Sequence, residues 1–183
     1  MSALGLALTG WIIILAYIPA SIDTKRSGVF TQERIGKGGM PFKVIKIRTM
    51  RDIPYFNTMV TALNDPRITP LGRFLRKTKI DELPQLINIF LGQMGFVGPR
   101  PDVAGYADKL MGEDRVILSV RPGITGPATL KYRREEELLA DQGDPEKYND
   151  EVIFPDKVRL NREYVVNYSF WKDIIYIYRT VFR

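Results

Sequence analysis

The sequence predicts an α/β fold that is mostly helical, with a membrane-embedded N-terminal helix, a small β-hairpin region and amphipathic helices at the membrane interface. Three features support this prediction: an uncharged apolar run at the start, a glycine-rich turn between two alternating segments, and later segments with helical periodicity. We therefore divide the chain into a membrane-inserted helix, residues 1–22, and a compact domain on the cytoplasmic face, residues 23–183.

The apolar run covers residues 2–22 and contains no charged side chain. As an α-helix it would extend roughly 30 Å, which is enough to cross the hydrocarbon core of a bilayer. Lys25 and Arg26 follow it closely, and the positive-inside rule then places the rest of the chain in the cytoplasm. A simple membrane anchor and a re-entrant helix both fit these residues.

Residues 29–50 are expected to form short strands around the turn at residues 36–39, which contains three glycines. Lys46 and Arg48 would share one face of the second strand, either as part of a site or as a solvated basic face. Residues 51–69 are rich in Pro and Asn and are expected to form a loop, in which part of the substrate specificity could reside.

Residues 71–78 are expected to form a short basic helix with one apolar edge. Such a helix suits the anionic headgroups of phospholipids. Arg76 lies on its polar edge, where its planar guanidinium could bind the phosphate of a lipid or of a substrate.

Asp81 and Glu82 stand where this basic segment changes into an apolar helix that begins near Pro84 and ends at Gly92. Five apolar residues of that helix recur at helical spacing and are predicted to form one buried face: Leu83, Leu86, Ile87, Phe90 and Leu91. Asp81 could simply cap the helix, together with Thr78. Alternatively, the helix dipole holds the carboxylates ionised, and the surrounding arginines and lysines suit a metal–phosphate substrate.

The composition narrows the chemistry further. The 183 residues carry a formal net charge of +6 and contain neither cysteine nor histidine. The absence of these residues excludes disulfides, thiolate chemistry and a histidine base. Catalysis would depend on carboxylates, hydroxyls, Lys, Arg or a hard cation, and carboxylates with Mg²⁺ are the natural choice for phosphate chemistry. The basic charge favours phosphorylated or anionic lipid partners, and no nucleic-acid motif is present.

The C-terminal half is predicted to be largely helical, with helices over residues 102–118 and 131–141 and a helix at the end of residues 154–183. The last of these combines aromatic and basic residues, as is typical of a helix at a membrane interface. Two stiff loops at residues 96–101 and 120–126 present Arg100 and Arg121, and backbone amides near Gly123 and Gly126 could approach a nucleotide.

Five blocks in this order resemble the bacterial sugar transferase family, the small monotopic polyprenyl-phosphate phosphoglycosyl transferases. The central block is Arg76 followed by residues 81–85, with the sequence Asp-Glu-Leu-Pro-Gln. The others are residues 30–36, 42–50, 96–101 and 120–126. The resemblance extends from about residue 10 to the C-terminus.

The resemblance implies the transfer of a phosphosugar from a nucleotide diphosphate sugar, a UDP-sugar, to polyprenyl phosphate, with release of UMP. Asp81 would be the nucleophile that forms an aspartyl phosphosugar intermediate. Glu82 would bind Mg²⁺ with it or assist proton movement from the acceptor. Five basic residues are expected to bind substrate phosphates: Lys46, Arg48, Arg76, Arg100 and Arg121. The reaction would be the first membrane step of polysaccharide or glycoconjugate assembly, on the cytoplasmic face of the bacterial inner membrane.

The resemblance also implies a re-entrant N-terminal helix with a break near Thr9 and Gly10, or at Pro19. Gln93 and Asn161 depart from the family pattern, which has Asp at both positions. Two other interpretations of the chain stay open. Asp81 could bind Mg²⁺ only, while the acceptor attacks directly, or the chain could be a non-enzymatic, basic membrane-binding module.

Overall fold

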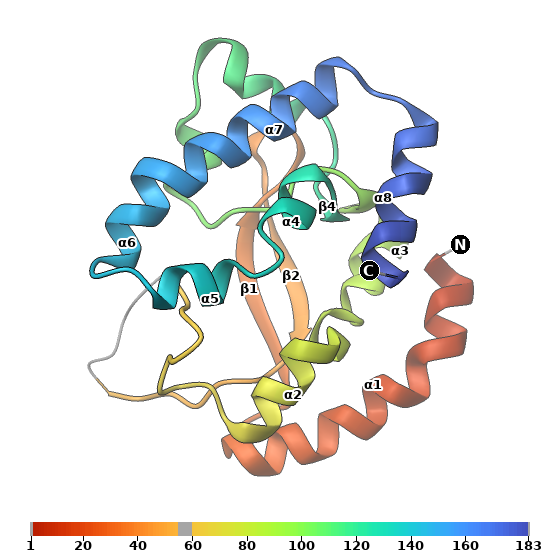
Figure 1. The fold of residues 1–183 in the computed structure, drawn as a ribbon. Helices are drawn as coiled ribbons and strands as arrows, with labels where there is room; N and C mark the ends of the chain where they lie inside the picture. Colours follow the sequence, from red (N-terminus) through yellow and green to blue (C-terminus); the bar gives the residue numbers. More distant parts are fainter. Residues whose placement is uncertain (1, 55–59, 183) are drawn as a thin grey trace. The chain divides into compact units, whose positions relative to one another are not determined.

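The computed structural model describes residues 2–54 and 60–182. Figure 1 shows a mostly helical chain with short strands, which confirms the predicted fold class. The chain forms two compact units: the first contains Met1–Gln32, Lys43–Thr58 and Asn64–Gly92, and the second contains Glu33–Phe42, Met59–Leu63 and Gln93–Arg183. The division at residue 22 between a membrane helix and a catalytic domain stays a prediction. Part of the expected loop, residues 55–59, lies outside the described residues.

Helix α1 (Ser2–Thr24) belongs to the first unit and confirms the predicted N-terminal helix. It is the one helix of the described chain that is long and apolar enough to cross a membrane. The helix continues through Thr9, Gly10 and Pro19, where a break was expected. The Thr9 hydroxyl donates to the Gly5 carbonyl at 2.7 Å, so this polar side chain is satisfied inside the helix. Its re-entrant topology stays a prediction.

Strands β1 (Val29–Ile35) and β2 (Pro41–Ile47) form a two-stranded sheet, as predicted. They are joined by a short 3₁₀ turn, η1 (Lys37–Gly39), in which Gly38 and Gly39 have φ angles of 71° and 81°. These left-handed conformations favour glycine, so the glycine-rich sequence makes the turn possible.

Helix α2 (Pro70–Thr78) confirms the predicted basic helix. It begins at Thr69, whose Oγ1 accepts a hydrogen bond from the Gly72 amide at 2.8 Å. A Cβ atom at Gly72 would lie 2.0 Å from the Thr49 carbonyl oxygen, so only glycine lets the helix approach this segment. Helices α1 and α2 and strand β2 share a small buried core, which contains Ala16, Ala20, Ile47 and Leu75.

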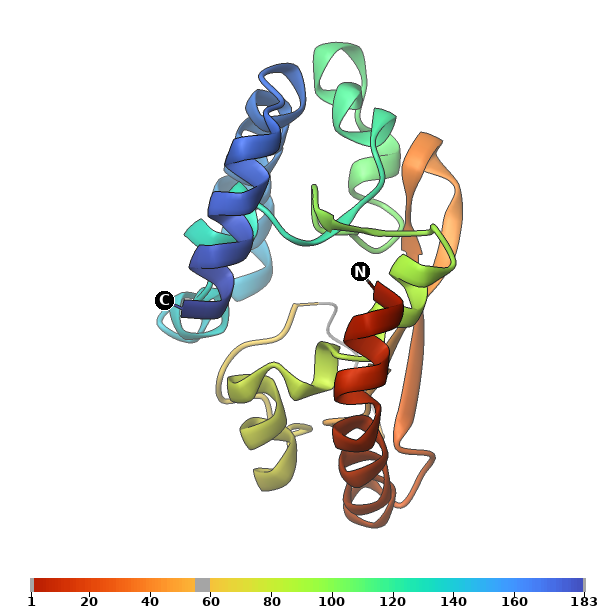
Figure 2. The same ribbon diagram turned by 90° about the vertical axis from the view of Figure 1, so that its right-hand side faces the viewer.

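Helix α3 (Gln85–Phe90) follows a 3₁₀ turn, η2 (Ile80–Glu82), and its burial differs from the prediction. Phe90 and Leu91 were expected to be buried but are 63% and 60% exposed. Leu86 is buried and reaches α1 at Gly5, where the two helices lie side by side (Figure 2). The buried positions also include the polar Gln85 and Asn88, because this helix turns a polar face inward.

The second unit contains a strand pair that the sequence did not reveal. Strands β3 (Gly95–Val97) and β4 (Gly123–Thr125) pair in parallel, with Gly95 opposite Gly123. The Gly123 amide donates to the Pro99 carbonyl at 2.9 Å, and a Cβ atom on Gly123 would lie 2.2 Å from the Gly98 nitrogen. The Gly123 amide is therefore used within the fold, and its glycine permits close backbone packing. The approach of amides near Gly123 and Gly126 to a nucleotide stays a prediction.

The remaining elements of the second unit are short. They are η3 (Ala107–Lys109), η4 (Gly112–Ser119), α4 (Pro127–Lys131), α5 (Glu135–Ala140), α6 (Pro145–Tyr148), the π-helical turn η5 (Asn149–Ile153), α7 (Phe154–Val166) and α8 (Phe170–Phe182). The single helices predicted over residues 102–118 and 131–141 are wrong in extent, whereas α8 confirms the aromatic helix predicted at the end of residues 154–183. In the first case Gly105 and Gly112 adopt positive φ angles of 102° and 59°, which interrupt an α-helix.

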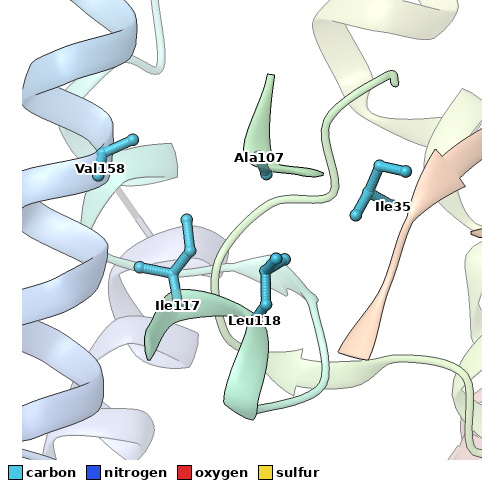
Figure 3. Packing of buried hydrophobic residues seen from close by; sticks show 5 residues of the cluster. All are labelled: Ile35, Ala107, Ile117, Leu118 and Val158. Carbon is cyan, nitrogen blue, oxygen red and sulfur yellow. The ribbon is translucent and has the colours of Figure 1, made fainter. Parts of the chain in front are cut away.

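A hydrophobic cluster holds the second unit together. Figure 3 shows its side chains, which come from β1, η3, η4 and α7 and point toward a common centre. They are Ile35, Ala107, Ile117, Leu118 and Val158. This core anchors α7, which also contacts η4, η5 and α4.

Candidate active site

The adjacent carboxylates Asp81 and Glu82 lie in η2, between α2 and α3 of the first unit. Lys79 ends α2 in a left-handed conformation with φ 60°, and its amide donates to the Arg76 carbonyl at 3.2 Å. This reversal turns the next residues inward. Asp81 is only 5% exposed and Glu82 8%, so two like charges share a buried position.

The helix-capping interpretation of these residues is wrong. The N-cap position of α3 is Pro84, and no side chain caps this helix. The Thr78 hydroxyl instead donates back to the carbonyls of Phe74 and Leu75, at 2.9 and 3.1 Å. Asp81 Oδ1 is buried and has no hydrogen-bond partner within the described part of the chain. A buried oxygen without a partner is costly, which makes Asp81 a functional candidate rather than a structural cap.

The electrostatics of Asp81 also differ from the sequence prediction. Burial and, after it, the charge of the neighbouring Glu82 raise the pKa of Asp81 from 3.8 to about 6, although Lys46, Arg76 and Lys79 act to lower it. Loss of hydration therefore outweighs the favourable charges, including any from the helix end. At pH 7 most Asp81 carboxyls are still ionised, but the charge is poorly solvated and therefore reactive.

Two of the predicted phosphate-binding residues lie beside the carboxylates. Lys46 on β2 places its Nζ 3.5 Å from Glu82 Oε1, and both side chains are largely shielded from solvent. Arg76 on α2 lies with its Nη1 3.4 Å from Thr49 Oγ1 and acts electrostatically on Asp81. These contacts place two cations, from different elements, around one carboxylate pair.

The other predicted phosphate ligands are placed differently. Arg48 donates from Nε to the Ser27 carbonyl at 2.7 Å and lies 5.3 Å from the centre of the Phe30 ring, so it is held by local contacts. Arg100 and Arg121 belong to the second unit, where Arg121 is exposed. The phosphate-binding roles of all three residues stay predictions.

Arg100 takes part in a second, half-buried charge cluster. Burial raises the pKa of Asp102 to about 6, and Lys157, Arg34 and Arg100 oppose this rise. Arg34 also donates to the Pro101 carbonyl at 3.2 Å. These interactions fix the segment around Arg100 within the second unit.

Two buried polar residues of α3, near the carboxylates along the chain, were not identified from the sequence. Gln85 is 2% exposed, and its Nε2 atom has no hydrogen-bond partner among residues 2–54 and 60–182. Asn88 is fully buried: its Oδ1 accepts from the Ile45 amide at 3.1 Å, and its Nδ2 donates to the Lys43 carbonyl at 2.8 Å. Asp81, Gln85 and Asn88 follow the spacing i, i+4 and i+7, and this polar periodicity was a readable signal.

Comparison with known proteins identifies the chain. The family model described as "Bacterial sugar transferase" matches residues 1–183. The chain belongs to this family.

Individual members of the bacterial sugar transferase family support this assignment. A UDP-glucose:undecaprenyl-phosphate glucose-1-phosphate transferase from Escherichia coli (strain K12) is 36% identical over 177 residues, covering 93% of this chain and 36% of the relative. An enzyme of the same name from Caulobacter vibrioides is 32% identical, covering 98% of this chain and 65% of the relative. A UDP-N-acetylgalactosamine-undecaprenyl-phosphate N-acetylgalactosaminephosphotransferase from Aeromonas hydrophila is 31% identical, covering 84% of this chain and 34% of the relative. The chain thus spans less than two thirds of each relative's length.

The donor atoms of the chain limit how it could hold a metal. No group of three or more His, Cys, Asp or Glu side chains that could bind a metal occurs in the described residues. Asp81 and Glu82 together offer carboxylate oxygens, of which Asp81 Oδ1 lacks a partner among the residues described. Mg²⁺ commonly takes one or two carboxylates and completes its coordination with water and substrate phosphates, so this pair fits an ion that arrives with a diphosphate.

Proposed function

We propose that this chain transfers a phosphosugar from a UDP-sugar to polyprenyl phosphate, with Asp81 as the covalent nucleophile. One observation carries the proposal: a buried carboxylate without a hydrogen-bond partner on Oδ1, among the residues described, is surrounded by cations that suit phosphate. The names of the relatives, which specify UDP-sugars and undecaprenyl phosphate, support the choice of substrates.

In the first half of the reaction, an Asp81 carboxylate oxygen attacks the phosphorus that bears the sugar. A bond forms between this oxygen and phosphorus, the bond to the bridging oxygen breaks, and UMP leaves with that oxygen. The carboxylate needs no base for this step because it is mostly ionised at pH 7. Lys46 and Arg76 offset the negative charge that develops on the phosphoryl oxygens.

In the second half, a phosphate oxygen of polyprenyl phosphate attacks the same phosphorus. The aspartyl–phosphorus bond breaks, Asp81 becomes a carboxylate again, and polyprenyl diphosphate sugar forms. Asp81 and Glu82 would hold Mg²⁺ together with donor phosphate oxygens. When bound, the ion would neutralise charge on the diphosphate.

The membrane supplies the acceptor lipid. Helix α1 exposes large apolar side chains along its length, and Phe74 on the basic helix α2 is 56% exposed in the same unit. These surfaces support a location in the bacterial inner membrane, with the site on the cytoplasmic face and basic residues near anionic phospholipid headgroups. The reaction would be the first membrane step in the assembly of a polysaccharide or glycoconjugate.

The activity is tested with the detergent-purified full chain, Mg²⁺, polyprenyl phosphate and a panel of UDP-sugars. We expect UMP release with at least one sugar, together with a lipid product that contains the sugar phosphate. The absence of UMP with every sugar would contradict the proposal and favour a membrane-binding module.

The metal requirement gives a second prediction. We expect EDTA to abolish UMP release, and Glu82→Gln to weaken the binding of Mn²⁺, as a probe of the Mg²⁺ site, by about tenfold in the presence of UDP. Electron paramagnetic resonance of free Mn²⁺ measures this affinity without turnover. The control Glu137→Gln changes an exposed glutamate, and equal Mn²⁺ affinity in both variants would rule out Glu82 as a ligand.

The raised pKa of Asp81 gives a prediction about pH. In a single-turnover reaction without polyprenyl phosphate, we expect the rate of adduct formation to rise with pH, to be half-maximal near pH 6 and to level off above pH 7. At pH 5 the rate should be about tenfold lower than on the plateau, because only the ionised carboxylate attacks. A rate that is half-maximal near pH 4 would show that burial does not raise the pKa of Asp81.

A further inference from the structure

Helices α4 and α8 of the second unit pack against each other and leave an open hollow of about 460 Å³. The residues that line it define the α4–α8 hollow: Pro127, Leu130, Lys131, Arg133, Tyr176 and Arg179. This volume falls within the range of small-ligand sites in proteins. None of these residues has a role in the reaction proposed above.

The hollow carries uncompensated positive charge. Lys131 is neutralised by Asp156, with 2.6 Å between Nζ and Oδ2. Arg133 and Arg179 are both exposed, and within the described chain neither has a hydrogen bond or an ion pair. Two guanidinium groups that line one hollow repel each other until an anion binds between them. The planar fork of arginine suits the oxygens of a phosphate group.

The acidic residues nearest to Tyr176 do not remove this charge. Glu163 and Asp173 both act electrostatically on Tyr176. Asp173 accepts a hydrogen bond from the Tyr164 hydroxyl at 2.8 Å, and Glu163 lies 3.9 Å from an Arg159 nitrogen. Each of these carboxylates therefore has its own partner away from Arg133 and Arg179.

The outer face of α8 indicates where such an anion would come from. Its exposed apolar residues recur on one side of the helix and form a strip: Phe170, Trp171, Ile174, Ile175, Tyr178, Val181 and Phe182. The opposite side packs inward, where Thr180 Oγ1 lies 2.6 Å from Thr125 Oγ1. Arg179 stands at the border between the two sides. A basic residue at this border is suited to the headgroup level of a membrane into which the strip inserts.

We propose that the α4–α8 hollow is a phosphate-binding site in which Arg133 and Arg179 hold one phosphate group, supplied by the headgroup of an anionic membrane lipid. This inference deepens the proposed membrane association and rests on it, but not on the chemistry of Asp81. The lipid phosphate would fix α8 at the membrane surface, with its apolar strip in the acyl region.

The test compares two phosphate probes on the full chain in a neutral detergent. Isothermal titration calorimetry measures the affinity for dihexanoyl phosphatidylglycerol and, separately, for UDP. We expect the double variant Arg133→Gln/Arg179→Gln to bind the lipid at least about tenfold more weakly than the unmodified chain, because charge-assisted hydrogen bonds are lost. The affinity for UDP should not change. The control Arg134→Gln alters an adjacent exposed arginine that does not line the hollow and should leave both affinities unchanged.

Each other outcome has a definite meaning. Equal affinity of the double variant and the unmodified chain for both probes would overturn the phosphate site. If the double variant lost affinity for UDP but not for the lipid, the hollow would still be a phosphate site, but its assignment to a lipid would be overturned. Adduct formation at Asp81 is measured in the same variant and should be unchanged. Lipid binding that depends on Arg133 and Arg179 would stand even if no transferase activity were found.

Discussion

Replacing Asp81 by Asn is expected to abolish both the covalent phosphosugar adduct and turnover. The amide is a poor nucleophile and cannot form the acyl phosphate, so the rate should fall on the order of a thousandfold or more. Intact mass spectrometry of the detergent-purified chain, incubated with Mg²⁺ and UDP-sugars but without polyprenyl phosphate, measures the adduct. Its mass also reveals the class of sugar.

The same experiment separates the covalent route from its alternative. An adduct that maps to Asp81 and is missing in Asp81→Asn would establish the intermediate, and the exposed control Asp141→Asn should keep it. Turnover in the unmodified chain with no adduct under any condition would instead favour direct attack by the acceptor, with Asp81 as a metal ligand.

Loss of activity in Asp81→Asn should not reflect unfolding. The pKa of Asp81 is higher in the folded state, about 6, than its ordinary value of 3.8. The folded protein therefore holds this proton more tightly, and ionisation of Asp81 destabilises the fold as pH rises from about 4 to 6. Above that range the cost is up to about 3 kcal/mol. Without Mg²⁺ or nucleotide, Asp81→Asn should melt at the same temperature or several degrees higher at pH 7.5.

The second large effect is expected at Asn88, which connects α3 to β2. Its side chain satisfies both the Ile45 amide and the Lys43 carbonyl, at 3.1 and 2.8 Å, and is fully buried. In Asn88→Leu these two backbone groups lose their partner in the interior. Each unsatisfied group costs about 1–3 kcal/mol, so we expect the free energy of unfolding to fall by about 2–5 kcal/mol.

Thermal and denaturant unfolding of the detergent-solubilised chain measure this loss. The matched control is Gln142→Leu, because the Gln142 side chain is half-buried and makes an exposed hydrogen bond, from Nε2 to the Leu138 carbonyl at 3.2 Å. The control should change stability by less than about 0.5 kcal/mol. If Asn88→Leu lowered the free energy of unfolding as little as the control does, Asn88 would not hold α3 against β2. Adduct formation should also fall in Asn88→Leu, since β2 carries Lys46.

Local sequence determined several elements of this protein. An uncharged apolar run specifies α1, because its side chains have no polar face to expose. The glycines at positions 38 and 39 specify the turn between β1 and β2, because they adopt positive φ angles. The order of a basic helix, two carboxylates and Pro84 likewise fixed the place of the candidate site along the chain.

Tertiary structure decided what those carboxylates are. The sequence left two alternatives, a helix cap and an ionised pair for a metal–phosphate substrate. Packing of α1, α2 and β2 around η2 buries Asp81 and raises its pKa. Lys46 meets Glu82, and Asn88 meets Lys43, only because segments far apart in the chain pack together. Turns and helix periodicity depend on a few neighbouring residues, so they can be predicted from local sequence. The desolvation and pairing of charges depend on which distant segments pack around them and exclude water, and a local sequence pattern does not contain this information.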